Sequence, residues 1–335
     1  MTSYEHHHWL DAPIDLGAPP TDTNLSRPHE QYDRLLHACR SLPPIRTAVV
    51  HPCDESSLEA LRAAAAGGLI DPVIVGPERR IRELASRMHV DLTNVPLIAA
   101  PHSHAAAEQA VTLARSGQVN ALMKGSLHTD ELMSEVIRRD AGIRTVRRIS
   151  HVFIMDVPTY PKPLFITDAA VNLFPSLEEK ADIVQNAIDL CHALGVALPK
   201  VAILSAVETI TSKIPSTIDA AALCKMADRG QITGAILDGP LALDNAINTQ
   251  AAAAKSIKSP VAGNADILLV PTLEAGNMLV KELTFLANAD AAGIVLGAQV
   301  PIILTSRADS VRARLASCAV AVLYARRTGS SEVGS

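Results

Sequence analysis

Short apolar runs rich in β-branched residues alternate along this chain with stretches of helical length and period, and this alternation restricts the possible folds more than any other feature. Clear examples of the runs are residues 47–50, 73–75 and 201–204. Strands that are joined through helices tend to run parallel, with the helices packed on the two faces of the sheet. The pattern therefore predicts an α/β fold with a largely parallel sheet.

Helix boundaries can be placed from the residues that usually begin and end helices. Ser176 and Glu179 have the spacing of a capping box, Gly195 stands where a helix usually ends, and Pro199 precedes the next apolar run. Residues 54–67 show the same order, with acidic residues first, an alanine-rich body and glycine at the end. Both stretches are predicted to be helices.

Composition limits the kinds of partner that the chain can have. Of its 335 residues, 48% are hydrophobic and 19% are charged, which is enough for substantial cores, and the length favours two lobes. Aromatic residues are only 3%, so the bases of single-stranded nucleic acid have no stacking platform, and the formal net charge of -5 repels polyanions. We therefore expect a small-molecule partner, held in a local basic pocket, and no nucleic acid.

The cysteines and the apolar stretches bear on the compartment. The five cysteines are scattered and form no CxxC motif, so neither a disulfide framework nor a zinc site is expected. The apolar stretch 291–305 is interrupted by Gln299 and Pro301 and is shorter than the roughly 20 residues of a membrane-spanning helix. Residues 1–28 have no secretory-signal pattern and are predicted to be a mobile arm. We expect a cytoplasmic protein without a membrane partner.

Ligands of open α/β sheets collect at the carboxyl ends of strands, so polar segments that follow apolar runs are the candidate sites. The sharpest one follows the apolar run 301–304. There Thr305, Ser306, Arg307 and Ser310 offer hydroxyl groups and a guanidinium, and residues 309–310 can open a helix whose free N–H groups attract anions. The alternative is a capped helix with Arg307 paired to a surface carboxylate.

Other strand-end motifs are less specific. Lys124, Gly125 and Ser126 follow an apolar run, and a lysine with backbone amides can hold a phosphate, although such sequences are common in ordinary loops. The run 138–148 carries five arginines, which suit either a solvated face or the phosphates of a nucleotide. Residues 271–277, which end at Asn277, form another polar segment directly after an apolar run.

Neither a G-x-G-x-x-G motif after a strand nor a Walker motif is present. His51 and Cys53 could in principle form a base and a thiol nucleophile, but a buried or loop cysteine is the more common arrangement.

Several carboxylates follow apolar runs and would suit either acid–base catalysis or a divalent metal. They are Asp168, Asp238, Asp244 and Glu274.

Four longer strings resemble one family. TDAAVN (167–172), KMADRGQITGAILDGPLALDNAI (225–247), VAGNADILLVPTLEAGNM (261–278) and PIILTSRADS (301–310) resemble the phosphate acetyltransferases and phosphate butyryltransferases, and SHVFIMD (150–156) extends the likeness. The resemblance covers residues 40–325 in the order of the family. The strings are most similar to the butyryltransferase branch and to the phosphate acetyltransferase domain of enoyl-CoA hydratase fusions.

The resemblance implies a fold with two αβα-sandwich domains and a cleft between them, like that of the isocitrate and isopropylmalate dehydrogenases, and a homodimer. Residues 29–158 plus 303–330 would form the first domain and residues 159–302 the second. The C-terminal segment would thus return to complete the first domain.

The resemblance also implies the reversible transfer of a short acyl group, acetyl or butyryl, between coenzyme A and inorganic phosphate, without a metal or redox cofactor. Acyl-CoA, phosphate and acyl phosphate would be bound in a ternary complex. Ser306 and Arg307 match the Ser-Arg pair that the family places at the reacting acyl phosphate. Where the acetyltransferase branch has an aspartate as base, this chain has Ala313.

The strand-end motifs and the resemblance together give each candidate an expected role. We expect Arg307, with Lys124, to hold phosphate, Ser306 to hydrogen-bond the developing oxyanion, and Asp309 to handle the thiol proton. The other substrate-binding candidates are Gly125, Ser126, Thr305, Ser310 and Asn277. Two alternatives stay open: an NAD-dependent dehydrogenase of the same superfamily, with a metal on Asp238, Asp244 or Asp266, and a relative that binds without catalysis.

Overall fold

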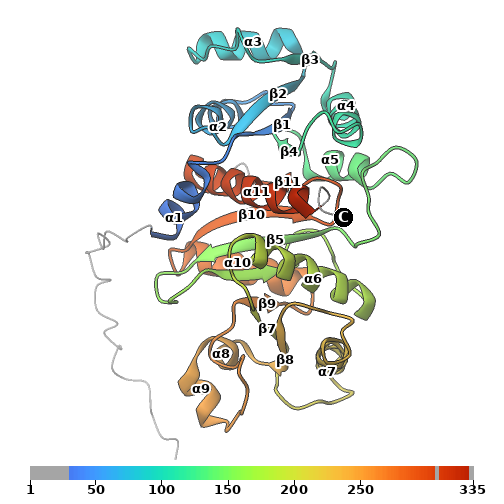
Figure 1. The fold of residues 1–335 in the computed structure, drawn as a ribbon, viewed down its shortest axis with the longest axis vertical. Coiled ribbons are helices and arrows are strands. Elements are labelled where there is room, and N and C mark those ends of the chain that lie inside the picture. The colour runs from blue at the N-terminus through green and yellow to red at the C-terminus, as the bar shows by residue number, and fades with distance from the viewer. Residues whose placement is uncertain (1–29, 306–308, 332–335) are drawn as a thin grey trace, which may run out of the picture.

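The computed structural model describes residues 30–305 and 309–331, and in this part of the chain eleven strands form one sheet (Figure 1). Their order is β3-β2-β1-β4-β11-β10-β5-β6-β9-β7-β8. The strands are β1 (Ile45–Val50), β2 (Ile70–Gly76), β3 (Leu97–Ala99), β4 (Ala121–Lys124), β5 (Ser150–Asp156), β6 (Leu164–Thr167), β7 (Lys200–Leu204), β8 (Ile236–Leu241), β9 (Ile267–Leu269), β10 (Asp290–Leu296) and β11 (Ile302–Ile303).

Helices connect most of these strands, as the alternating pattern predicted. They are α1 (Glu30–Cys39), α2 (Glu55–Ala66), α3 (Glu78–Arg87), α4 (Ser103–Arg115), α5 (Thr129–Val136), α6 (Leu177–Ala193), α7 (Pro215–Asp228), α8 (Leu243–Ile247), α9 (Thr249–Ala254), α10 (Leu273–Phe285) and α11 (Val311–Ser331).

The predicted helix boundaries are confirmed. The side chain of Asp54 accepts a hydrogen bond from the backbone of Ser57 and caps α2, which ends at Gly67. Ser176 and Glu179 form the capping box at the start of α6. Gly195, just beyond the end of α6, has a φ of +90°, a conformation that glycine adopts without strain.

The sheet is parallel on both sides of an antiparallel centre. β3, β2, β1, β4 and β11 run in one direction, and β6, β9, β7 and β8 run together in the other. Between them β10 pairs antiparallel with both β11 and β5, and β5 pairs antiparallel with β6. The carboxyl ends of β4 and β11 therefore lie at the same edge of the sheet as the start of β10 and the end of β5.

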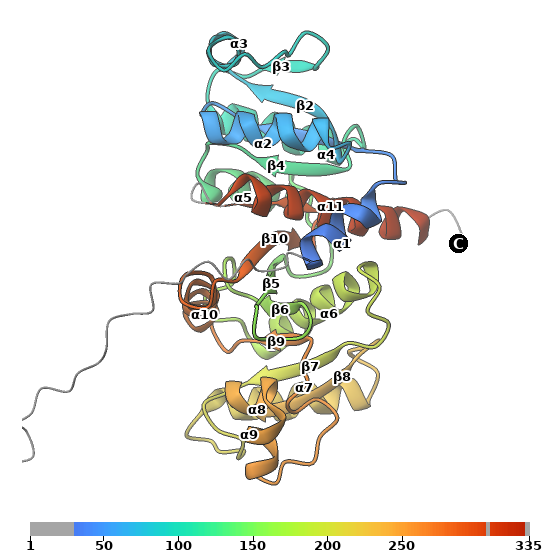
Figure 2. The ribbon, with the colours of Figure 1, turned by 90° about the vertical axis from the view of Figure 1, so that its left-hand side faces the viewer.

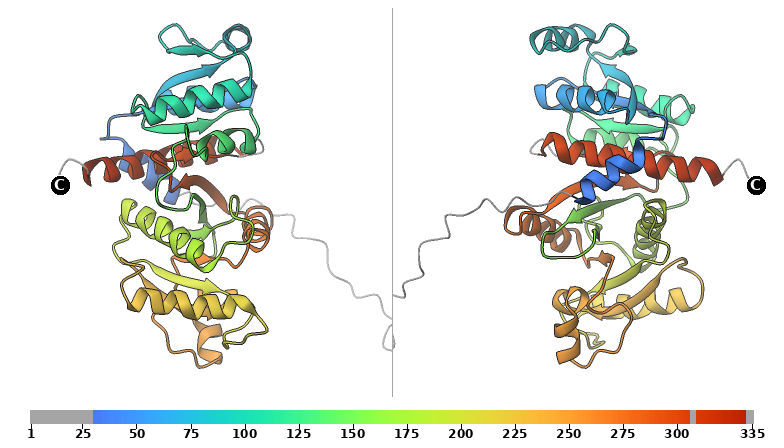
Figure 3. Two further views of the ribbon diagram at one scale, coloured as in Figure 1. Left: turned by 90° about the vertical axis from the view of Figure 1, so that its right-hand side faces the viewer. Right: turned by 60° about the vertical axis from the view of Figure 1, so that its left-hand side comes forward.

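The last strand, β11, returns from the end of the chain and lies between β4 and β10 (Figure 1), and Figure 3 shows the C-terminal helix α11, in red, crossing the middle of the molecule. Strands that are far apart in the sequence thus meet at the centre. The predicted division into residues 29–158 plus 303–330 and residues 159–302 stays a prediction, and the predicted arm, residues 1–28, lies outside the described residues.

The buried side chains form one continuous core on one face of the sheet and two separate cores on the other. The continuous core includes Leu58 of α2, Ile183 of α6 and Val320 of α11. On the opposite face, α4 and α5 cover one core, whereas α8 and α10 cover another. α11, with α1 beside it, lies along the junction of the two halves (Figure 2).

Candidate functional site

Two of the predicted site segments meet where β4 and β11 end. The strands are parallel neighbours, with Met123 opposite Ile303, so Lys124 and Thr305 follow at the same edge of the sheet. β1 pairs with β4 on the other side, which places His51 next to this edge as well. The structure therefore brings the Lys124 segment and the start of the Thr305 segment together, although they are far apart in the sequence.

The Lys124 side chain is anchored at this edge. Its side chain is buried, and its Nζ donates hydrogen bonds to the backbone oxygens of Gly125 (3.3 Å) and Leu127 (3.2 Å). A buried ammonium group needs such oxygen partners, because leaving it without them would cost several kcal/mol. The contacts fix the ammonium against the loop that follows β4.

The same loop is attached to the end of β1. Gly125 and Ser126 donate backbone hydrogen bonds to Val50 (2.9 Å) and His51 (3.0 Å). A Cβ atom at Gly125 would lie 2.4 Å from the Val50 oxygen, so only glycine fits there. The Ser126 hydroxyl donates to the His51 oxygen (2.8 Å) and accepts from the Cys53 N–H (3.1 Å). In this structure it braces the loop, and its contact with substrate stays a prediction.

Ser306 and Arg307, the predicted catalytic pair, lie outside the described residues. Their neighbours Thr305 and Ser310 are described. Thr305 is buried, and in the described part of the chain its hydroxyl has no hydrogen-bond partner. The Ser310 hydroxyl accepts a hydrogen bond from the Ala313 N–H (3.1 Å), so it caps α11 as the sequence predicted.

The start of α11 is held by an arginine that the sequence analysis missed. Arg314 is only 4% exposed, and its Nε donates to the backbone oxygen of Asp309 (3.3 Å). Its Nη1 donates to the backbone oxygen of Ser56 at the start of α2 (3.3 Å). Arg314 thereby connects the backbone at Asp309 to the start of α2. The role of Asp309 as a base stays a prediction.

Asn277 and Asp168 lie in the other half of the sheet. Asn277, on α10, donates to the backbone oxygen of Ala169 (3.2 Å), in the loop after β6. Because β6 runs opposite to β4, its carboxyl end faces the other edge of the sheet. The sheet topology therefore places Asn277 and Asp168 at the opposite edge from Lys124 and Thr305.

Asp168 is committed to hydrogen bonds within the protein. One carboxylate oxygen accepts from the N–H groups of Ala170 (2.8 Å) and Val171 (3.0 Å). The other accepts from the His151 N–H (3.1 Å) and from Asn172 Nδ2 (2.6 Å). Burial raises its pKa, whereas these bonds favour the charged form. These hydrogen bonds indicate a structural role for the Asp168 carboxylate rather than a role as an acid or a base.

The carboxylates proposed for a metal do not gather. Asp266 pairs with Lys162 (2.6 Å) and accepts from the Lys200 N–H (2.8 Å). Within residues 30–305 and 309–331, no group of three or more His, Cys, Asp or Glu side chains is placed to hold a metal ion. In the same ranges, no helix is long and apolar enough to span a membrane.

His151 is a second residue that the sequence analysis missed. Its ring lies beside Gly293, where an added Cβ would be 2.9 Å from the His151 Nε2 atom. The centre of the His151 ring lies 4.2 Å from the centre of the Phe153 ring. Burial lowers its pKa to about 3, and a hydrogen bond with the Leu304 backbone opposes this shift. The imidazole is therefore neutral at physiological pH and links β5, across β10, to the residue before Thr305. In the sequence, the signal that could have identified His151 is a histidine within the otherwise apolar run 150–156.

Cys53 does not have the properties of a nucleophile. Its side chain is buried, and burial raises its pKa to about 11, with a further increase from Asp54 and a partial decrease from Arg80. The thiol is therefore almost entirely protonated at neutral pH.

Most of the arginine run 138–148 is used in ion pairs. Arg138 pairs with Glu135 (2.9 Å), Arg147 with Asp189 (3.1 Å), and Arg148 with Glu179 (2.9 Å). These pairs support a solvated, structural face for that part of the run.

The chain is similar to known phosphate acyltransferases over most of its length. Residues 102–322 match the family described as Phosphate acetyl/butaryl transferase. The chain is 64% identical over 303 residues to a phosphate acetyltransferase of Rhizobium meliloti, a match that covers 90% of this chain and 96% of the relative. It is 39% identical over 298 residues to a phosphate butyryltransferase of Clostridium beijerinckii, covering 89% and 99%.

A solved structure has the same fold. The branched-chain phosphotransacylase of Enterococcus faecalis superposes with a TM-score of 0.72 at 29% identity, covering 84% of this chain and 99% of that one. The predicted fold class is thereby confirmed.

Proposed function

The chain belongs to the phosphate acetyl/butyryl transferase family, and we infer that it is an acyltransferase that reversibly transfers a short acyl group between coenzyme A and inorganic phosphate. The observation that supports this most directly is the buried Lys124 ammonium at the end of β4, beside the strand that leads to Ser306 and Arg307. A fixed cation at this edge can orient a phosphate dianion.

In the proposed reaction, a phosphate oxygen attacks the thioester carbonyl carbon. A C–O bond forms, the C–S bond breaks, and the sulfur leaves as a thiolate that takes up a proton. Arg307 and Lys124 hold phosphate, Ser306 donates to the oxyanion, and Asp309 exchanges the proton with sulfur. In the reverse direction Asp309 removes the thiol proton before sulfur attacks acyl phosphate.

Both substrates react while bound together, because a well-oriented pair can recover roughly 7–11 kcal/mol of the barrier. Gly125, Ser126, Thr305 and Ser310 line the phosphate end, and Asn277 contacts coenzyme A. We further propose a homodimer in the cytoplasm that needs no metal, binds neither nucleic acid nor membrane, and has the two-domain division given above.

One assay tests the function. Purified protein is mixed with acetyl-CoA or butyryl-CoA, with or without phosphate, and thiol release is followed with and without EDTA or NAD. We expect release that depends on phosphate and is unaffected by EDTA. Activity that needs NAD and a metal would instead support the dehydrogenase alternative, and no turnover would support a binding protein.

A further inference from the structure

The proposed reaction also moves a proton at its phosphate end. Monohydrogen phosphate carries one proton, which has to leave before the product is an acyl phosphate dianion, whereas Asp309 serves the sulfur. A group that removes the proton of phosphate has to lie beside Lys124, at the edge of the sheet where β1, β4 and β11 end.

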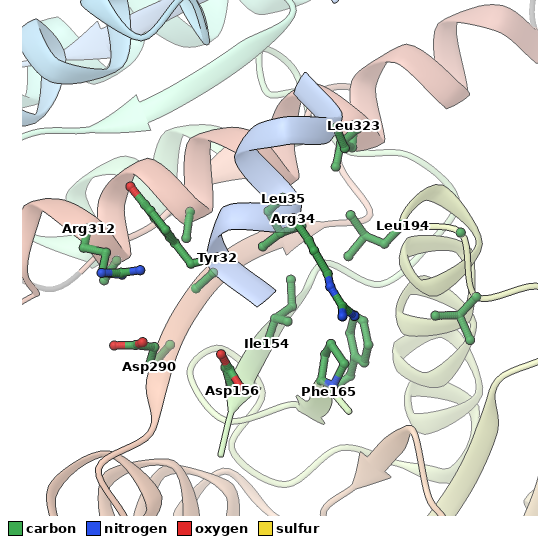
Figure 4. A pocket seen from close by; sticks show the side chains of 18 residues that line it. Tyr32, Arg34, Leu35, Ile154, Asp156, Phe165, Leu194, Asp290, Arg312 and Leu323 are labelled. Atoms are coloured by element: carbon green, nitrogen blue, oxygen red, sulfur yellow. The ribbon is translucent and has the colours of Figure 1, made fainter. Parts of the chain in front are cut away.

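A cavity of about 420 Å³ between α1, α11, the end of α6 and the strands β5, β6 and β10 does not reach this place (Figure 4). It lies on the face of the sheet that carries the continuous core, to which Met123 belongs. Leu122 belongs to a core on the other face, so Lys124, two residues later, points away from the cavity. The proton acceptor is therefore expected where β1 ends and the loop after β4 begins.

His51 lies at this place. It directly follows β1, whose last residue, Val50, pairs with Lys124. Its N–H donates to the Val75 oxygen (2.7 Å), and its oxygen accepts from the Ser126 N–H (3.0 Å), so the ends of both neighbouring strands hold its backbone. Its φ of +53° is in the left-handed region, which residues other than glycine rarely adopt and which is enriched at functional sites.

The hydrogen bonds of the Ser126 hydroxyl fix the tautomer of His51. A hydroxyl group has one proton to donate and two lone pairs with which to accept. Ser126 donates its proton to the His51 oxygen (2.8 Å) and accepts from the Cys53 N–H (3.1 Å). The remaining contact, between the hydroxyl and His51 Nδ1 (3.3 Å), is therefore a hydrogen bond that Nδ1 donates. In the neutral ring the lone pair is then on Nε2, which can accept a proton.

Nε2 of His51 is accessible to a substrate. The residue is only half-buried, and in the part of the chain that the structure describes no group forms a hydrogen bond with this nitrogen. Burial lowers the pKa of His51, and Arg80 in the first turn of α3 lowers it further, whereas Glu131 on α5, the His51 oxygen and Asp54 before α2 partly oppose this. The ring is therefore neutral at physiological pH.

We propose that His51 is a further catalytic residue, the base that takes the proton of phosphate while Lys124 holds phosphate in place. The proposal rests on the proposed function. As the phosphate oxygen forms the C–O bond, its proton moves to His51 Nε2. The electron pair of the C–S bond goes to sulfur, which takes a proton from Asp309. His51 then releases its proton to water, and Asp309 regains one. In the reverse direction the His51 imidazolium returns a proton to the phosphate oxygen that leaves the carbonyl carbon.

Kinetics of His51→Asn test this role. Asparagine tolerates a positive φ and offers an N–H donor to Ser126 at the place of Nδ1, but it has no basic nitrogen. At saturating acetyl-CoA or butyryl-CoA, kcat/KM for phosphate should fall by about 100-fold or more, the usual contribution of a general base. KM for the thioester should stay near the wild-type value.

The pH dependence separates a base from a structural residue. The ratio of wild-type to His51→Asn kcat/KM for phosphate should be constant above a pH of about 6.5 and should decrease at lower pH, where His51 becomes protonated. The titration of phosphate itself affects both proteins equally, so it cancels in this ratio.

His51→Gly is the second variant, because glycine adopts a positive φ without strain and leaves space for a free imidazole molecule. Added imidazole should restore part of its activity. His89→Asn is the matched control. His89 is exposed and has a φ of +54°, but it follows the end of α3, whereas the edge with Lys124 lies at the start of that helix. Its rates and pH profile should equal those of the wild type.

Wild-type kcat/KM in a folded His51→Asn would overturn the proposal. A ratio that does not change with pH would also overturn it, because the loss of activity would then have a structural cause. A wild-type enzyme without phosphate-dependent turnover of either thioester would instead refute the proposed function, on which the role of His51 depends.

Discussion

Single residues at the site are explained by the space and the partners around them. Gly125 is required where the loop after β4 touches the end of β1, and Gly293 leaves the space that the His151 ring occupies. Gly297 likewise permits close backbone packing, because a Cβ there would lie 2.4 Å from the Arg148 oxygen.

At Arg307 we predict that Arg307→Ala folds normally and loses about 100-fold or more in kcat/KM, because water cannot replace a guanidinium that binds phosphate through two hydrogen bonds. Arg307→Lys keeps the charge but lacks the paired N–H donors of the guanidinium, so it should recover little of the lost activity. Steady-state rates and circular dichroism of both variants check this. Near wild-type rates in either variant would refute the role.

At Cys53 we predict that Cys53→Ala keeps most of its activity, because a thiol with a pKa of about 11 supplies little thiolate at neutral pH. Initial rates at varied acyl-CoA and phosphate should give intersecting lines, as expected for a ternary complex. Parallel lines, a trapped acyl-enzyme or an inactive but folded Cys53→Ala would instead assign the nucleophile to Cys53.

At the scale of elements, three central strands are connected through one side chain. His151 on β5 reaches past Gly293 on β10 to the Leu304 backbone beyond β11. Its backbone also donates to Asp168 and accepts from the Thr167 hydroxyl (2.8 Å). This link joins the loop after β6 to the strand that leads to the site.

This link predicts a pH dependence of stability. The pKa of His151 is about 3 in the folded chain and roughly 6.5 when unfolded, so the unfolded state binds the extra proton between these values. The contribution of neutral His151 to the free energy of unfolding is fully present above pH 6.5. It is lost as the pH falls toward 3, by up to about 1.4 kcal/mol per pH unit.

His151→Phe removes the titrating group and keeps an aromatic ring. We expect its free energy of unfolding to fall less steeply than that of the wild type between pH 6.5 and 4.5, measured by urea denaturation at several pH values. Between pH 7.5 and 8.5, the control range, the two proteins should show the same slope. Equal slopes in the acidic range would contradict the prediction.

At the scale of the whole molecule, we predict that the arm of residues 1–28 is dispensable for catalysis. Its sequence has neither periodic apolar residues nor a strand-end motif. A chain that begins at residue 29 should therefore keep its kcat and its oligomeric state, measured by thiol release and size-exclusion chromatography. If a folded, dimeric truncation is inactive, the arm contributes to an active site.

The sequence by itself determined the fold class, the main helix caps and the family. These depend on local signals, such as Ser176 with Glu179 or the string PIILTSRADS, which are complete within short segments. Lys124 and Thr305 could also be selected, because each directly follows an apolar run.

Only the tertiary structure decided which candidates meet. The reversal of strand direction at β5 and β10 separates Asn277 and Asp168 from Lys124, although all of them follow strands. The attachment of α11 to α2 through Arg314, the neutral state of His151 and the cavity along α11 likewise depend on segments that are far apart in the sequence. Burial and hydrogen bonding are properties of such packed surroundings, so no local pattern could specify them.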